Sequence, residues 1–153
     1  MSSGSWRRPT GVTTQPSSPN PVVQLRLVVE AHDFDEAVSF YRDVLGLPEE
    51  AAFEGSGSER VVILQAGRAT LELANPAQHR MIDDVEVGRH VAPKFRVAFE
   101  VADSDRATSD LVAAGATLVA PPVETPWRSL NARLDAPAGL HITLFEELGP
   151  PAE

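Results

Sequence analysis

Residues 26–39, RLVVEAHDFDEAVS, recur seventy positions later as residues 96–109, RVAFEVADSDRATS. Arg, Glu, two Asp, Ala and Ser return in place. In each copy an alternating apolar run ends at an Asp in a helix-capping position, which predicts a strand that leads into a helix. A unit built twice, with one open sheet face in each copy, must bury or close those faces together. The repeat therefore predicts two modules around a cleft.

The first module is predicted as βαβββ. Its first strand is expected over 22–30, and its helix begins after Asp33, which has the capping-box spacing to Glu36, and ends at Gly46. Three further β-prone runs, separated by Gly- and Ser-rich turns, are expected to be strands at 48–54, 60–65 and 68–74.

The second module repeats this order. Its first strand is expected over 94–102, and its helix extends from Asp103 or Ser104 to Gly115. The remaining strands are expected at 117–123, 129–134 and 140–145. Between the modules, residues 76–92 read as a connection with a short helical turn near Met81 and Ile82.

The predicted domain organisation is a disordered leader at 1–21, one domain at 22–147 and a flexible tail at 148–153. Within the domain the modules occupy 22–75 and 93–147. The leader is rich in Ser, Thr and Pro and lacks the apolar core of a secretory signal. No run approaches the roughly 18 apolar residues of a membrane span. We therefore expect a cytoplasmic protein.

Charge and cysteine content exclude several kinds of partner and chemistry. The formal net charge of −9 repels phosphate backbones and anionic lipid, so we expect neither nucleic acid nor membrane as a partner. The chain contains no cysteine, which rules out disulfides, thiolate nucleophiles and sulfur-ligated metals. With 153 residues, of which 42% are hydrophobic, the chain is expected to fold as one compact domain.

Short motifs along both halves point to a known family. Residues 40–47 read FYRDVLGL, and the second half contains AAGA at 113–116, PW at 126–127 and DAPAG at 135–139. In this order, over residues 22–147, the motifs resemble the vicinal oxygen chelate superfamily of glyoxalases, extradiol dioxygenases and bleomycin-resistance proteins. The resemblance implies an α+β fold in which tandem βαβββ modules form a curved mixed sheet around a cup.

Superfamily members that bind a metal hold it with four side chains, typically His, Glu, His and Glu, on the first and last strands of each module. The resemblance places Arg26, Glu72, Arg96 and Thr143 at these positions. Only Glu72 is a good ligand for a divalent ion, because a guanidinium stays protonated near neutral pH and repels a cation. We therefore expect no metal and no cofactor in the cup.

The alternation of the two repeated strands puts Arg26 and Arg96 on their polar faces. A guanidinium suits a two-pronged hold on a carboxylate, phosphate or phosphonate, so one of the two arginines is a candidate anion binder. The alternative is that Glu72 bridges both arginines in a purely structural network.

Two other side chains have a functional and a structural interpretation. His141 is expected to share a face with Thr143, where it would be a general base, an off-pattern metal ligand beside Glu72, or a structural histidine. Trp127 follows Pro126 in a proline-rich loop and would either stack on a flat ligand at the rim of the cup or pack in the core.

The sequence favours metal-independent binding of a small molecule, of the resistance or sequestration kind, with no catalytic residue assigned. A homodimer is expected, since small members of the superfamily often complete the cup with strands from a second chain. The alternatives are a metal-dependent lyase, isomerase or dioxygenase with a non-standard ligand set, and a structural dimer with a vestigial cup. The predicted ligand-binding residues are Arg26, Glu72, Arg96, Trp127, His141 and Thr143.

Overall fold

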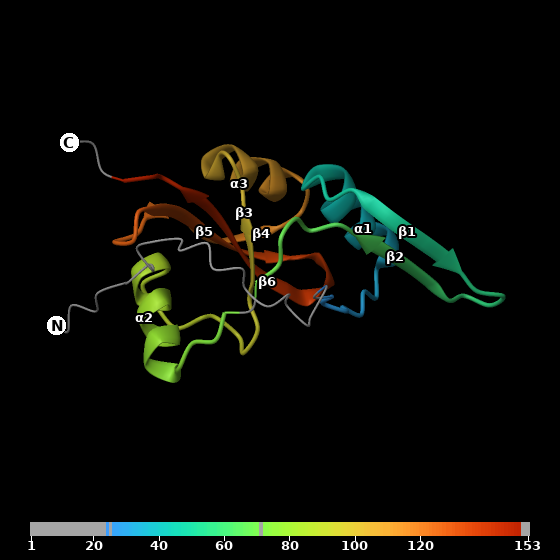
Figure 1. The fold of residues 1–153 in the computed structure, drawn as a ribbon, viewed down its shortest axis with the longest axis horizontal. Coiled ribbons are helices and arrows are strands. Elements are labelled where there is room, and N and C mark those ends of the chain that lie inside the picture. Colours follow the sequence, from blue (N-terminus) through green and yellow to red (C-terminus); the bar gives the residue numbers. More distant parts are fainter. Residues whose placement is uncertain (1–23, 25, 71, 151–153) are drawn as a thin grey trace, which may run out of the picture.

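The computed structural model describes residue 24 and residues 26–70 and 72–150 (Figure 1). The elements follow in the order α1 (Phe34–Val38), a π-helical turn η1 (Ser39–Val44), β1 (Glu49–Glu54), β2 (Arg60–Leu64), α2 (Pro76–Glu86), β3 (Val97–Glu100), α3 (Ser104–Ala113), β4 (Thr117–Glu124), β5 (Ser129–Ala136), a 3-10 turn η2 (Pro137–Gly139) and β6 (Leu140–Glu147). The fold is α+β with a curved mixed sheet, as the sequence predicts. The predicted leader at 1–21 lies outside the described residues.

The second half forms a four-stranded sheet in the order β3-β6-β5-β4. β3 runs parallel to β6, and the other neighbouring strands are antiparallel, so the sheet is mixed. Each strand expected in this half is present within a few residues of its predicted bounds. With α3 between the first two strands, the order β3, α3, β4, β5, β6 is the predicted βαβββ unit.

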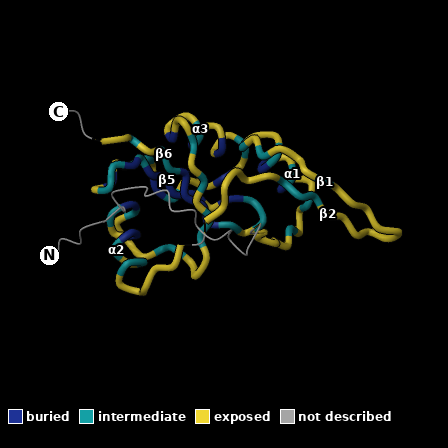
Figure 2. The backbone as a smooth tube through the Cα atoms, in the orientation of Figure 1, coloured by how far each residue is buried: buried dark blue, intermediate teal, exposed yellow. Residues whose placement is uncertain are grey.

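The hydrophobic core lies between one face of this sheet and the helices α1, η1 and α3 (Figure 2). Side chains from both halves of the chain build it: Ala37, Phe40, Tyr41, Leu111, Ala116, Ala132, Leu134, Ala136, Ile142 and Leu144. Alternate side chains of a strand point to the same face, so β5 and β6 each give the core every second residue. The hydroxyl of Tyr41 also donates to the carbonyl of Pro137 at 2.8 Å, which fixes the first-half helix to the β5–β6 turn.

Both copies of the repeat begin their helix in the same way. Before α1, Oδ1 of Asp33 accepts from the N–H of Glu36 at 3.0 Å, and before α3, Oδ1 of Asp103 accepts from the N–H of Arg106 at 3.0 Å. Each cap satisfies a backbone N–H that has no partner inside its helix. The cap predicted at Asp33 is confirmed, and the alternative of Asp103 or Ser104 resolves to Asp103.

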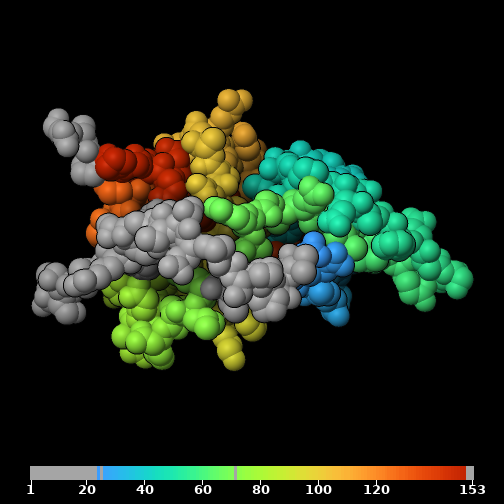
Figure 3. Space-filling view, viewed as in Figure 1, coloured from blue at the N-terminus to red at the C-terminus, as the bar shows by residue number. Residues whose placement is uncertain are grey.

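The first half contains less sheet than the sequence predicts. β1 and β2 pair antiparallel as a separate two-stranded hairpin, which agrees with the expected strands at 48–54 and 60–65. The hairpin projects beyond the body of the molecule (Figures 1 and 3).

The strands expected at 22–30 and 68–74 are wrong for the described residues of both runs, which form no strand. An alternating run becomes a strand only when a neighbour takes up its backbone hydrogen bonds. No such neighbour lies beside these runs in the described chain, and the side chains of Leu27, Val28 and Leu73 are 60%, 84% and 87% exposed.

The connection between the halves contains a longer helix than the sequence predicts. Instead of a short turn near Met81 and Ile82, α2 extends over 11 residues. Oδ1 of Asn75 caps it by accepting from the N–H of Gln78 at 2.9 Å, and Pro76 occupies its first turn. α2 lies on the opposite side of the four-stranded sheet from α3 (Figure 1). None of the helices in the described residues has the length and apolar content needed to cross a bilayer.

Replacing Tyr41 with Phe will lower the free energy of unfolding by about 1 kcal/mol, because the ring still packs but the carbonyl of Pro137 loses its donor. Urea denaturation of the two proteins measures the difference. A variant as stable as the native protein would show that this hydrogen bond does not hold the two halves together.

Candidate functional site

The face of the four-stranded sheet turned away from the core is polar. It carries Asn131 and Arg133 of β5 and His141 and Thr143 of β6, which alternate with the core residues of the same strands. Arg133 and Thr143 lie directly opposite each other in the strand register. All four side chains are buried, and part of what buries them is α2, which places two carboxylates on this face.

Arg133 is the centre of the hydrogen-bond network on the polar face, and it is 0% exposed. Its Nε donates to Oε2 of Glu86 at 2.6 Å, and its Nη1 donates to Oδ1 of Asp83 at 2.8 Å. Nη1 also lies 3.1 Å from Nε2 of His141. A buried guanidinium needs such partners, since an uncompensated charge in the interior costs several kcal/mol.

Asp83 and Glu86 project from one side of α2, because residues three apart share a helix face. They are 2% and 4% exposed. The second oxygen of Glu86 accepts from Nδ2 of Asn131 at 2.6 Å, and the second oxygen of Asp83 accepts the backbone N–H groups of Val91 and Ala92 at 2.8 and 2.9 Å. The surface that α2 turns toward the sheet is therefore largely charged.

The ionisation of Asp83 depends on these contacts. Burial alone would raise the pKa of Asp83, but the N–H groups of Ala92 and Val91 together with Arg133 outweigh it and hold the pKa below its usual value. A carboxyl with a lower pKa in the folded state stabilises the fold above the unfolded pKa of about 3.9. That stabilisation is lost as the pH falls through the lower, folded value, so acid weakens the contact between α2 and the sheet.

His141 has a defined tautomer in this network. Because a guanidinium nitrogen only donates, Nε2 of His141 accepts from Arg133. The proton is then on Nδ1, which donates to Oδ1 of Asp135 at 2.8 Å. Both ring nitrogens are thus occupied by protein partners, which favours the structural interpretation of His141 over that of a general base.

Arg96 lies one residue before β3, beside the network, and is half-buried. Its Nη1 donates to Oγ1 of Thr143 at 2.6 Å. Burial lowers the pKa of Arg96 and the nearby charge of Arg133 lowers it further, while neighbouring carboxylates, Glu86 first, oppose both effects. Among the ion pairs between described side chains, none involves Arg96. A cationic group in this position attracts an anion.

The structure brings together three of the six predicted ligand-binding residues: Arg96, His141 and Thr143. Glu72 is exposed in an irregular segment, and its charge raises the pKa of Arg96. Arg26 is exposed and outside any strand, and its Nη2 donates to Oε1 of Gln24 at 3.2 Å. Arg26 therefore does not join the others on the polar face of the single chain.

Trp127, the sixth predicted residue, is half-buried in the turn that joins β4 to β5. The turn is closed by the N–H of Thr125, which donates to the carbonyl of Ser129 at 2.8 Å, and Arg128 within it has a φ of 63°. This places the indole at one end of the sheet. Its contact with a ligand stays a prediction.

Four members of the network are missing from the predicted set: Asp83, Glu86, Asn131 and Arg133. The alternation of residues 129–134 was a signal for two of them, since it separates Asn131 and Arg133 from the apolar residues between them. The spacing of Asp83 and Glu86 indicates one face of a helix, but no pattern in the sequence shows which part of the sheet that helix covers.

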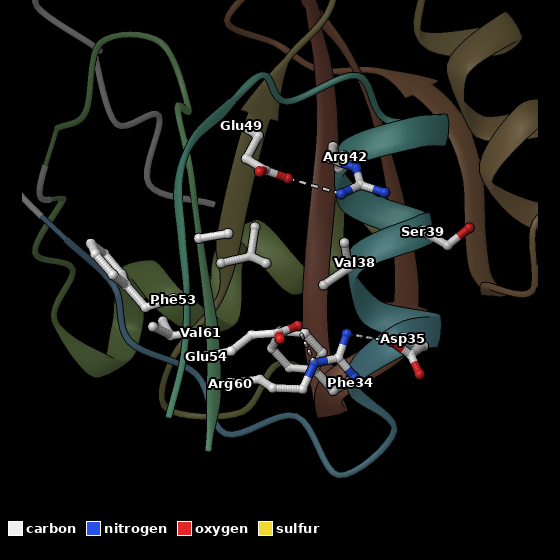
Figure 4. A pocket seen from close by; sticks show the side chains of 12 residues that line it. Phe34, Asp35, Val38, Ser39, Arg42, Glu49, Phe53, Glu54, Arg60 and Val61 are labelled. Carbon is white, nitrogen blue, oxygen red and sulfur yellow. Dashed lines mark hydrogen bonds and ion pairs between the residues drawn. The ribbon is translucent and has the colours of Figure 1, made fainter. Parts of the chain in front are cut away.

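A hollow of the described structure lies elsewhere, between the helix α1–η1 and the hairpin β1–β2, and has a volume of about 400 Å³ (Figure 4). Its charged side chains pair with one another: Arg42 donates to Glu49 at 2.9 Å, and Arg60 lies 2.9 Å from Asp35. The guanidinium of Arg60 also covers the ring of Phe34 at 4.5 Å. These contacts fasten the hairpin to the helix, and they leave no set of groups directed at a ligand.

The α+β fold, with a curved mixed sheet that has an apolar core face and a polar face, defines a class that is seen in solved structures. A glyoxalase-related enzyme from Fulvimarina pelagi has a TM-score of 0.51 at 15% identity, covering 86% of this chain and 94% of that one. A member of the glyoxalase/bleomycin resistance protein/dioxygenase superfamily from Sphaerobacter thermophilus has a TM-score of 0.52 at 23% identity, covering 78% and 92%. A glyoxalase family protein from Bacillus cereus has a TM-score of 0.51 at 24% identity, covering 86% and 99%.

Comparison of the sequence with known families identifies the family of this chain. Residues 26–145 match the family described as glyoxalase-like domain. The chain belongs to this glyoxalase-like domain family, which confirms the resemblance to the vicinal oxygen chelate superfamily. None of the curated proteins matches the chain in sequence.

The metal that superfamily members often hold does not fit the side chains of this site. Arg96 is cationic and donates to Thr143, and both nitrogens of His141 have protein partners. Over residues 26–70 and 72–150, no group of three or more His, Asp and Glu side chains is placed to hold a metal ion.

Replacing Glu86 with Gln will destabilise the protein by about 3–5 kcal/mol, because it leaves the buried charge of Arg133 partly uncompensated. The matched control is Glu49→Gln, which removes an exposed partner of Arg42 and will change stability little. Chemical denaturation of both variants gives the comparison. Equal effects from the two substitutions would contradict a special role for the buried pair.

Proposed function

We propose that this glyoxalase-like protein binds a small acidic molecule at the polar face of its four-stranded sheet, without a metal centre, and that Arg96 holds the acidic group. The observation that carries the proposal is the environment of Arg96. Its side chain is half-buried, and its hydrogen bond is to the neutral hydroxyl of Thr143. The charge with the largest effect on its pKa is that of another guanidinium, Arg133. A planar guanidinium binds a carboxylate, phosphate or phosphonate through two parallel hydrogen bonds.

The neighbouring residues have supporting roles in this proposal. Thr143 orients the guanidinium of Arg96 through the 2.6 Å hydrogen bond. Trp127 stacks on an unsaturated part of the ligand at the end of the sheet. Binding or sequestration is favoured over catalysis because both nitrogens of His141, the histidine of this face, are engaged by Arg133 and Asp135. The cytoplasmic location expected from the sequence stays a prediction.

A second candidate function is purely structural, and the network around Arg133 favours it. Two internal carboxylates already neutralise this guanidinium, as they would in a site that binds nothing. Arg96 distinguishes the two proposals. A purely structural network does not need a second, half-buried guanidinium whose hydrogen-bond partner is a hydroxyl. Stoichiometric metal in protein purified without chelator would contradict both and favour a metal-dependent enzyme of the superfamily.

We also propose that the protein acts as a homodimer. Among the described strands β3 pairs only with β6, and the described parts of 22–30 and 68–74 have strand-like sequences that are unpaired. Leu27, Val28, Leu73 and Phe95 are exposed along these segments. A second copy that paired with them would bury this apolar surface. It would also bring Arg26 and Glu72 into a shared cup, as expected from the resemblance to the superfamily.

Replacing Arg96 with Ala will abolish or strongly weaken binding of small acids, because the group that holds the anion is removed. Calorimetric titration with succinate, inorganic phosphate and phosphonoacetate measures this, and Arg106→Ala, an exposed arginine on α3, is the matched control. Native affinity in Arg96→Ala would overturn the proposed site. Weaker binding in Arg26→Ala would show that residues 26–30 reach the site in solution.

A Leu27→Glu/Leu73→Glu double variant will be monomeric at protein concentrations where the native chain is dimeric, because charges on the proposed interface oppose its burial. Sedimentation equilibrium measures the two states. Val112→Glu, an exposed apolar residue on α3, is the control and will leave the dimer intact. A double variant that dimerises as the native chain does would place the interface elsewhere.

A further inference from the structure

We infer that α2 is a displaceable lid over the anion site, and that its carboxylates Asp83 and Glu86 take the place of a dicarboxylate ligand on the polar face. The inference rests on the proposed anion site beside Arg96 and adds the ligand class and the way in which the site opens. When the ligand binds, its carboxylates replace those of α2, and the helix moves away from the sheet.

The first argument is the way in which the helix carboxylates are held. One oxygen of Glu86 accepts from Nε of Arg133 and the other accepts from Nδ2 of Asn131, both at 2.6 Å, and Asp83 accepts from Nη1 of Arg133 at 2.8 Å. Convergent arginine and amide donors on adjacent same-face positions of one strand are the groups that recognise a free carboxylate. The sheet thus presents a built carboxylate site, which the chain's own helix fills.

The second argument is that α2 leaves this site incompletely satisfied. Nη2 of Arg133 and Oδ1 of Asn131 are buried and have no hydrogen-bond partner among the described protein atoms. Arg133 is 0% exposed, so this donor is enclosed by protein. A buried polar atom without a hydrogen bond has lost its hydration and gained no partner, so it makes the network less stable. A ligand carboxylate that reaches Nη2 pairs a donor that α2 does not.

The third argument is the weak apolar attachment of α2. Of its three buried residues, Ile82 is apolar and the other two are Asp83 and Glu86. The chain is exposed before α2, at 72–75, and after it, at 88–90. Opening the lid returns both carboxylates to water and recovers the hydration lost on burial. The hydration that the α2 carboxylates recover offsets the hydration that the ligand carboxylates lose.

The charges of the site favour a ligand with two acidic groups. Arg96 and Arg133 place two positive charges on the polar face, and the buried carboxylates of α2 supply two negative ones. A dicarboxylate supplies two negative charges after α2 has moved, one for Arg133 and one for Arg96. A monocarboxylate leaves one buried guanidinium without a counter-charge, which disfavours its binding.

Succinate and butyrate have equal chain length and differ in one carboxylate, so they are the probes. Hydrogen exchange of the native protein will show faster exchange of the α2 amides with succinate and no change with butyrate. Asn75→Ala, which removes the cap of α2, will tighten succinate binding about fivefold by calorimetry, because the closed state loses stability and the open fraction rises.

Asp103→Ala is the matched control, since it removes the cap of α3 on the other side of the sheet. Its affinity for succinate in 0.15 M salt will equal that of the native protein. Succinate binding that protects the α2 amides, or that is unchanged in Asn75→Ala, overturns the lid and leaves the proposed function standing. Absence of succinate, phosphate and phosphonoacetate binding to native protein and to Asn75→Ala overturns both.

Discussion

The polar face of the sheet depends on one buried ion pair network, that of Arg133 with Asp83 and Glu86. A guanidinium with no exposed surface cannot be left without partners, so the sequence between the halves has to supply negative charge at this point. This requirement places α2 on the sheet, and it explains why a helix with one fully buried apolar residue is held there. The same network covers Thr143 and His141 and partly encloses Arg96. The geometry of the candidate site therefore follows from the neutralisation of one side chain.

The two faces of the sheet have different physical origins. The core face is formed by apolar residues from both halves, and Tyr41 links the first-half helix to the β5–β6 turn through a 2.8 Å hydrogen bond. Hydrophobic burial has no preferred direction, so this face tolerates a helix that comes from either copy of the repeat. The polar face is held by directional hydrogen bonds, and its partners are consequently few and specific.

The sequence predicted the second half of the fold well because the signals there are local. Alternation defined the strands, and the cap at Asp103 defined the start of α3. The resemblance to the superfamily put Arg96 and Thr143 at two of its ligand positions, and in the structure Nη1 of Arg96 donates to Oγ1 of Thr143. The prediction for the first half was wrong where local signals were insufficient. The runs around Leu27 and Leu73 have strand patterns, but a strand also needs a paired neighbour. α2 was underestimated because its buried face is made of carboxylates, which do not appear in an apolar periodicity.

The chemistry of the site differs from that of a metal-binding relative because of the charge at a few positions. Where the superfamily uses neutral imidazole and carboxylate to hold a cation, this chain has Arg96 and, on the same face, Arg133. Two guanidinium groups within one enclosed surface repel each other, and that repulsion lowers the pKa of Arg96 in addition to the effect of burial. The repulsion is relieved by any anion that lies between them, whether it belongs to α2 or to a ligand. On this face the carboxylates of α2 supply the negative charge that pairs with Arg133, whereas the hydrogen-bond partner of Arg96 is the neutral hydroxyl of Thr143.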